Sequence, residues 1–128
     1  MKFPAWYGIL VGIFMVAQWV FSLLSDGVPE LQSAPWEIGF HLAAEMSTAF
    51  LLTLGGLATL MSISWGKQVL LLALGMVIYS EMVSPGYFAQ LKQWLLVAMF
   101  ALLLVGAVMS TILLVSGNDQ SLREKQAS

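Results

Sequence analysis

Four long apolar segments constrain the fold of this chain more than any other feature. They cover about residues 6–24, 36–62, 68–83 and 94–115. A helix needs about 20 apolar residues to cross the hydrocarbon core of a bilayer. Only 9% of the 128 residues are charged, against the quarter or so expected in a soluble domain. We therefore predict an all-α, integral membrane, four-helix transmembrane bundle with antiparallel neighbouring helices.

Short connections between these segments leave no room for a soluble domain. We expect one four-span transmembrane domain over residues 1–116, followed by a polar tail, residues 117–128, that is disordered or lies on the surface. Ser84-Pro85-Gly86 predicts the end of the third helix, because proline cannot donate a backbone hydrogen bond. The first span is expected to remain as a transmembrane helix, since no clear small-residue cleavage site follows it.

Basic residues in short loops predict the orientation. Lys2, Lys67, Arg123 and Lys125 fall on one side of a four-span arrangement, and only Lys92 falls on the other. Because positive charges favour the cytoplasmic side, we predict a multi-pass protein with both termini cytoplasmic. Aromatic residues expected near the inner interface are Trp6, Tyr7 and Trp65, and those expected near the outer one are Trp36, Tyr87 and Trp94.

Ionisable residues interrupt the apolar pattern of the second span. Glu37, His41 and Glu45 lie four residues apart. In a helix this spacing places all three within about 80° of one another, along about 12 Å of the axis. A charged group in hydrocarbon costs about 2.5 to 3.5 kcal/mol, so such residues usually face a bundle interior and often mark a functional site.

Three more polar residues are predicted at a similar depth. Gln18 and Ser22 lie one turn apart in the first span, and Glu81 lies near the end of the third. The predicted topology puts all six side chains in the outer half of the membrane. Structural roles stay open: Glu37 could be solvated, Glu81 could reach the outer surface, and His41 and Glu45 could satisfy each other.

Two kinds of chemistry suit this cluster. A divalent metal ion could be held by Glu37, His41 and Glu45, which offer oxygen and nitrogen ligands. The same groups could relay protons, since carboxyl groups next to lipid can take up protons and histidine changes its charge near neutral pH. The chain has no cysteine, which excludes a thiolate metal site or an iron–sulfur cluster. No other cofactor is indicated.

Small residues at four-residue spacing predict where the helices pack. Lipid gives helices no hydrophobic reason to associate, so small residues that allow close backbone approach often mark interfaces. The candidates are Gly8, Gly12, Gly55, Gly106 and Ser110.

Two short stretches support a further alternative. Ala44-Glu45-Met46-Ser47-Thr48-Ala49 and Ile78-Tyr79-Ser80-Glu81 resemble the acidic helix segments of the emopamil-binding and sterol-isomerase (EXPERA) superfamily. The resemblance implies four spans with both termini inside. It also implies a membrane cavity for a sterol-like ligand, lined by the carboxyl groups of Glu45 and Glu81.

Three functional hypotheses follow. The first is a protein that binds or moves a cation or protons within the bilayer, as a homo-oligomer. The second is a non-catalytic accessory subunit of a larger membrane complex. The third is a protein that binds or isomerises a lipid or sterol-like ligand. The sequence contains no phosphate-binding glycine loop or nucleophile elbow, and its basic residues are too few to predict nucleic-acid binding.

Overall fold

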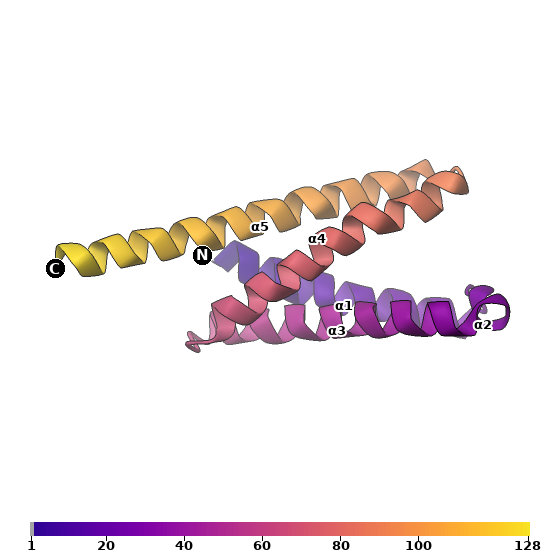
Figure 1. Cartoon of the computed structure of the whole chain (residues 1–128), viewed down its shortest axis with the longest axis horizontal. Helices are drawn as coiled ribbons and strands as arrows, with labels where there is room; N and C mark the ends of the chain where they lie inside the picture. Colours follow the sequence, from indigo (N-terminus) through magenta and orange to yellow (C-terminus); the bar gives the residue numbers. More distant parts are fainter. Residues whose placement is uncertain (1) are drawn as a thin grey trace.

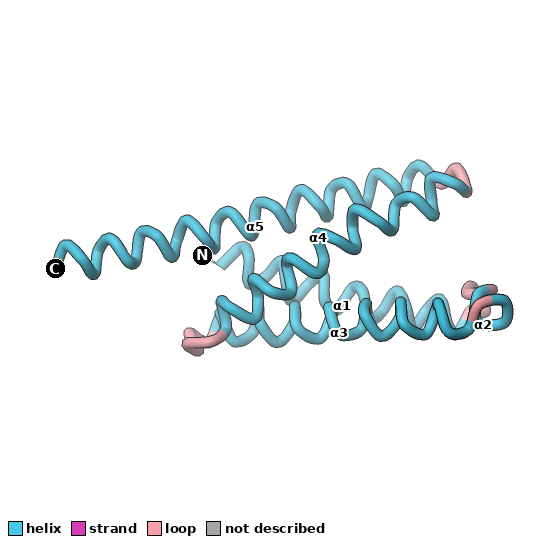
Figure 2. Tube along the Cα trace, in the orientation of Figure 1, coloured by secondary structure: helices cyan, strands magenta, loops and turns pink. Residues whose placement is uncertain are grey.

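The computed structural model describes residues 2–128, apart from the side chains of Asn118 and Asp119. Every regular element in this range is a helix, and the loops between them are short (Figure 2). The helices are α1 (Lys2–Leu24), α2 (Glu30–Ser33), α3 (Pro35–Leu60), α4 (Gly66–Gln90) and α5 (Trp94–Ala127). Four of them, α1, α3, α4 and α5, are long and apolar enough to cross a membrane. The predicted all-helical class and the four candidate spans are therefore confirmed.

The long helices pack mainly in sequential pairs. α3 lies against both α1 and α4, and α4 lies against α5, whereas α3 and α5 make no contact within residues 2–128. Figure 1 shows both termini and the α3–α4 turn at one end of the bundle, which we name the terminal end. α2 and the α4–α5 turn lie at the opposite end, which we name the α2 end.

Small residues let the helices approach closely. A Cβ atom added to Gly55 would lie 2.6 Å from the backbone nitrogen of Leu70, and one added to Gly56 would lie 2.6 Å from the carbonyl oxygen of Ala5. α1 approaches α3 in the same way, since a Cβ on Gly8 would lie 2.9 Å from the carbonyl oxygen of Leu52. The backbones of α1 and α4 therefore touch α3 directly at these positions.

A residue with left-handed backbone geometry lies two positions after the end of three of the long helices, α1, α3 and α4. These residues are Asp26, Ser62 and Lys92, with φ of 54°, 59° and 57°. After α3, the N–H of Ile63 donates to the carbonyl of Ala58 and that of Ser62 donates to Thr59. This is the Schellman arrangement, which satisfies the last carbonyl groups of a helix. Ser62, predicted to close the second span, therefore belongs to the turn.

The predicted end of the third span at residue 83 is wrong, because α4 runs through Pro85 to Gln90. Proline at this position removes the hydrogen bond that its N–H would have donated to the carbonyl of Glu81, and its ring crowds that carbonyl. The last turns of α4 are held by tertiary contacts instead, since the ring of Phe88 stacks on Phe100 of α5 with 5.6 Å between the ring centroids. Glu81 consequently lies well inside its helix.

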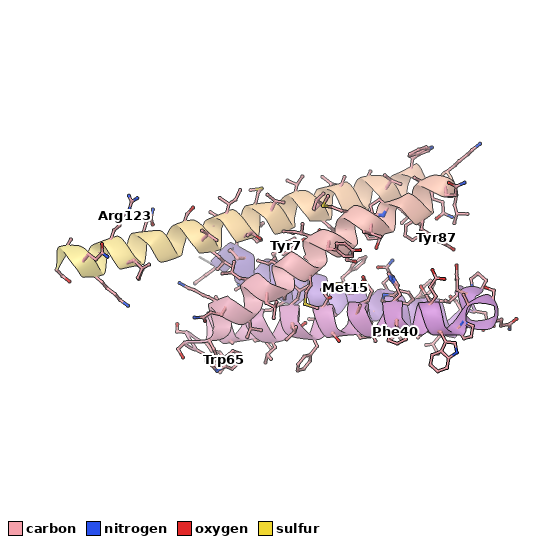
Figure 3. All side chains as sticks on the ribbon, viewed as in Figure 1. Tyr7, Met15, Phe40, Trp65, Tyr87 and Arg123 are labelled. Carbon is pink, nitrogen blue, oxygen red and sulfur yellow. The ribbon has the colours of Figure 1, made fainter. Side chains whose placement is uncertain are left out.

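The polar tail is helical and not disordered, and its residues 120–128 are exposed, so its predicted location at the surface is not contradicted. α5 continues to Ala127 and extends beyond the N-terminus in Figure 1. Its last residues include strong helix formers such as Leu122, Arg123, Glu124 and Lys125. Adding residues to an existing helix avoids the cost of nucleating a new one, which favours this extension. Arg123 projects from it, away from the rest of the bundle (Figure 3).

Candidate functional site

Glu81 is the most deeply buried ionisable residue that the sequence singled out. Its side chain is 3% exposed, and it lies on the face of α4 that also carries Leu74 and Val77. The hydroxyl of Tyr7 on α1 lies 3.3 Å from Glu81 Oε1. Glu81 Oε2 has no hydrogen-bond partner within the described part of the chain. A carboxyl group without water or a cationic partner is costly to bury, so its hydroxyl contact matters for stability.

The hydroxyl of Tyr7 faces two acceptors. It lies 2.5 Å from the carbonyl oxygen of Leu103 on α5 as well as 3.3 Å from Glu81. A phenol has one hydrogen to donate and can also accept. An ionised Glu81 can accept from Tyr7, and a protonated Glu81 can donate to Tyr7 while Tyr7 donates to Leu103. Both forms of the carboxyl group therefore have a hydrogen-bonding arrangement without movement of the helices.

Glu45 is the second carboxyl group of the site, and it is half-buried on α3. It accepts a short hydrogen bond from the hydroxyl of Ser80 on α4. Ser80 directly precedes Glu81 in α4, so this hydrogen bond brings Glu45 next to the segment that carries the second carboxyl group. The structure thus brings together Tyr7, Glu45, Ser80 and Glu81 with the carbonyl of Leu103, and all four long helices contribute. We name this group the carboxyl cluster.

Glu37 and His41 lie outside the carboxyl cluster, on the same helix as Glu45. Both are exposed, although helical spacing places them near the direction of Thr48 and Leu52, which are buried. The ring of His41 meets the ring of Trp19 on α1 edge to face, with 5.7 Å between the centroids. Because α3 begins at the α2 end, these two residues lie between that end and Glu45.

Gln18 and Ser22 take no visible part in the carboxyl cluster. Both are partly buried on α1, and no side-chain hydrogen bond in residues 2–128 joins either of them to Glu45 or Glu81. The possible metal site also lacks support, because the described residues contain no group of three or more His, Cys, Asp or Glu placed to hold a metal ion. Glu37, His41 and Glu45 follow one another along the helix axis, so they do not surround a common point.

Of the two small residues singled out on α5, Gly106 lies beside the carboxyl cluster. A Cβ atom on Gly106 would lie 2.6 Å from the ring of Tyr7, so the glycine makes space for that ring. Ser110, one turn further, is fully buried, and its hydroxyl has no partner among the described residues. Gly12 on α1 faces the carbonyl of Ala49, 2.7 Å from where its Cβ would lie.

An apolar groove of about 730 Å³ runs between α1 and α3. Its walls include Val20, Phe21, Met46 and Phe50, with a hydroxyl contributed by Thr53. Neither Glu45 nor Glu81 lines it. The groove therefore lends no support to a sterol-like ligand held by these carboxyl groups.

Sequence reasoning missed Tyr7 and Ser80 as members of the site. We predicted Tyr7 at the membrane interface, but its hydroxyl reaches across to α4 and α5. A sign was present in the sequence, because Gly106 could have marked the space for a large neighbouring side chain. Ser80 lies beside Glu81, yet its partner on α3 could not be identified without the rotation of both helices.

Comparison with known proteins identifies a family. No curated protein and no solved structure shows significant similarity to the chain. One protein family does match, and its match covers residues 1–127, which include every residue of the carboxyl cluster. The chain therefore belongs to the family described as domain of unknown function DUF8058.

Proposed function

We propose that this protein spans a membrane as a four-helix bundle and binds and moves protons through Glu45 and Glu81. The observation that carries the proposal is the pairing of each carboxyl group with a hydroxyl group, Ser80 for Glu45 and Tyr7 for Glu81. Hydroxyl groups both donate and accept hydrogen bonds, so they can serve a carboxyl group in either protonation state. In its protonated form Glu81 would carry the proton on Oε1, the oxygen atom that lies 3.3 Å from the Tyr7 hydroxyl.

Protons suit this site better than a metal cation. A bound calcium ion needs about six to eight oxygen ligands, and magnesium demands a near-ideal octahedron. In the carboxyl cluster the hydroxyls of Tyr7 and Ser80 are already directed at the carboxyl groups and at the carbonyl of Leu103 instead of at a shared ion position. The absence of a three-ligand group among residues 2–128 agrees with this preference.

The decisive experiment measures proton flux in liposomes. Purified protein is reconstituted with a pH-sensitive dye inside the vesicles, and a proton gradient is imposed. We expect the native protein to dissipate the gradient, and Glu45→Gln or Glu81→Gln to reduce flux to the level of protein-free vesicles. Glutamine keeps the size of the side chain but cannot exchange a proton at its carbonyl oxygen.

A matched substitution controls for the loss of one acidic group. Glu124→Gln makes the same change on the exposed last turns of α5 and should leave the flux unchanged. Circular dichroism and size-exclusion chromatography establish that each variant is folded. Native flux in a folded Glu45→Gln, or flux of potassium or sodium ions at the same rate as protons, would contradict the proposal.

A further inference from the structure

Exposure of the acidic and imidazole side chains changes steadily along α3 and into α4. Glu37 and His41 are exposed, Glu45 is half-buried, and Glu81 is 3% exposed. The order runs from the α2 end towards the interior. Successive residues at four-residue spacing are neighbours on a helix surface, with about 5 to 6 Å between their Cβ atoms. One water molecule can bridge polar groups at that separation.

Apolar side chains fill the bundle between the carboxyl cluster and the terminal end. Leu52, Leu70 and Leu74 are fully buried between the carboxyl cluster and the terminal end. The backbones of α3 and α4 are in direct contact there, at Gly55 and Gly66. Among the described residues, the core of this region consists of apolar side chains, with the ring of Tyr7 packed against it. The acidic and imidazole side chains next to the carboxyl cluster, Glu37 and His41, therefore lie on the side of the α2 end.

Resting on the proposed function, we infer that protons reach the carboxyl cluster only from the α2 end and that His41 is the residue through which they pass. The imidazole takes a proton from water on one ring nitrogen and releases one from the other nitrogen towards Glu45. Trp19 holds the ring by its edge-to-face contact and so keeps it beside α1. The structure is then the state open to the α2 end, and transport across the membrane requires a second arrangement in which the Leu52, Leu70 and Leu74 packing opens.

Cysteine labelling tests this path without measuring flux. The native chain has no cysteine, so single substitutions can be read directly. His41→Cys is treated in membrane vesicles with a charged thiosulfonate that cannot cross the bilayer. Ser33→Cys on α2 and Ser128→Cys at the C-terminus report which end faces the reagent. We expect His41→Cys to react when Ser33→Cys reacts and to stay unmodified when only Ser128→Cys is accessible.

Phe40→Cys is the matched control. Phe40 precedes His41 at nearly the same depth and is 76% exposed, but it lies about 100° away around the helix. A cysteine that faces lipid stays in the unreactive thiol form, so we expect His41→Cys to react on the order of tenfold faster. Equal rates for the two variants, or labelling of His41→Cys from the terminal end, would overturn the inferred path.

The flux and labelling experiments distinguish an error in the inferred path from an error in the proposed function. If His41→Cys is not labelled from the α2 end while Glu45→Gln still abolishes flux, the one-sided path is wrong and the proton function stands. If labelling follows the expected pattern but native flux equals that of empty vesicles, the water path exists and the proposed function is wrong. In the flux assay we expect His41→Phe to reduce the rate and Phe40→Leu to leave it unchanged.

Discussion

The hydroxyl of Tyr7 joins three helices at a single point. It contacts Glu81 on α4 and the carbonyl of Leu103 on α5, while its own backbone belongs to α1. Gly106 leaves the space that the ring fills. The Tyr7 hydroxyl therefore links Glu81 of α4 to the contact of α1 with α5.

Removal of this hydroxyl should destabilise the fold. We expect Tyr7→Phe to lower the free energy of unfolding by about 1 to 3 kcal/mol, because the buried carboxyl of Glu81 loses its donor. Thermal or denaturant unfolding in detergent, followed by circular dichroism, measures the change. Tyr79→Phe is the control, since Tyr79 is 71% exposed on α4 and should change stability by less than about 0.5 kcal/mol. Equal effects of the two variants would show that the Tyr7 hydroxyl contributes nothing specific.

At the scale of the elements, α3 packs against two of the other three long helices, α1 and α4. α1 and α4 contact it through glycines, and α5 reaches the bundle through α4 and the N-terminal half of α1. In Figure 3, Trp65 and Tyr87 mark the opposite ends of α4, with Trp65 at the turn after α3. The pairing of α3 with α4 determines where Ser80 meets Glu45.

Two glycines on neighbouring helices test this pairing. Gly55→Ala would place a Cβ atom 2.6 Å from the backbone of Leu70, so we expect a loss of about 1 to 3 kcal/mol from overpacking. Gly75 has no atom within 4 Å of such a Cβ. Gly75→Ala should therefore stabilise α4 by up to about 1 kcal/mol, through helix propensity alone. If both alanine variants unfold at the same temperature as the native protein, the close contact of α3 with α4 is wrong.

The lengths of α4 and α5 show where local signals mislead. Pro85 and Gly86 are strong helix-ending residues, but the Phe88 and Phe100 rings hold the last turns of α4 in place. Within a helix, glycine costs about 1 kcal/mol and proline about 3 kcal/mol relative to alanine, and tertiary packing can override such preferences. Glu81 therefore lies nine residues before the end of α4, and not beside that end as the sequence predicted.

At the scale of the whole molecule, basic residues are distributed unequally between the two ends of the bundle. Lys2, Lys67, Arg123 and Lys125 lie at the terminal end, whereas Lys92 lies at the α2 end. We expect the terminal end to face the cytoplasm, because positively charged loops are retained there. The proposed proton path would then open to the outside.

A reporter fusion checks this orientation. An enzyme that is active only in the cytoplasm, fused after Ser128, should be active, and one fused within the loop before α2 should not. Activity with the opposite pattern would reverse the assignment. Replacement of Lys67 and Arg123 by glutamine should weaken the preference, since basic residues near the ends of the spans determine it.

The sequence by itself determined the four candidate spans, the small residues that would permit close packing and the position of Glu45 well inside its span. These follow from the cost of exposing polar groups to hydrocarbon and from the periodicity of a helix, and both can be read along one chain. Only the tertiary structure decided which side chains meet. The Tyr7 to Glu81 and Ser80 to Glu45 contacts depend on the rotation and crossing of helices that lie far apart in the sequence, and on the continuation of α4 past Pro85. Rotation of a helix about its axis is determined by the neighbours against which it packs, so it exists only in the assembled bundle.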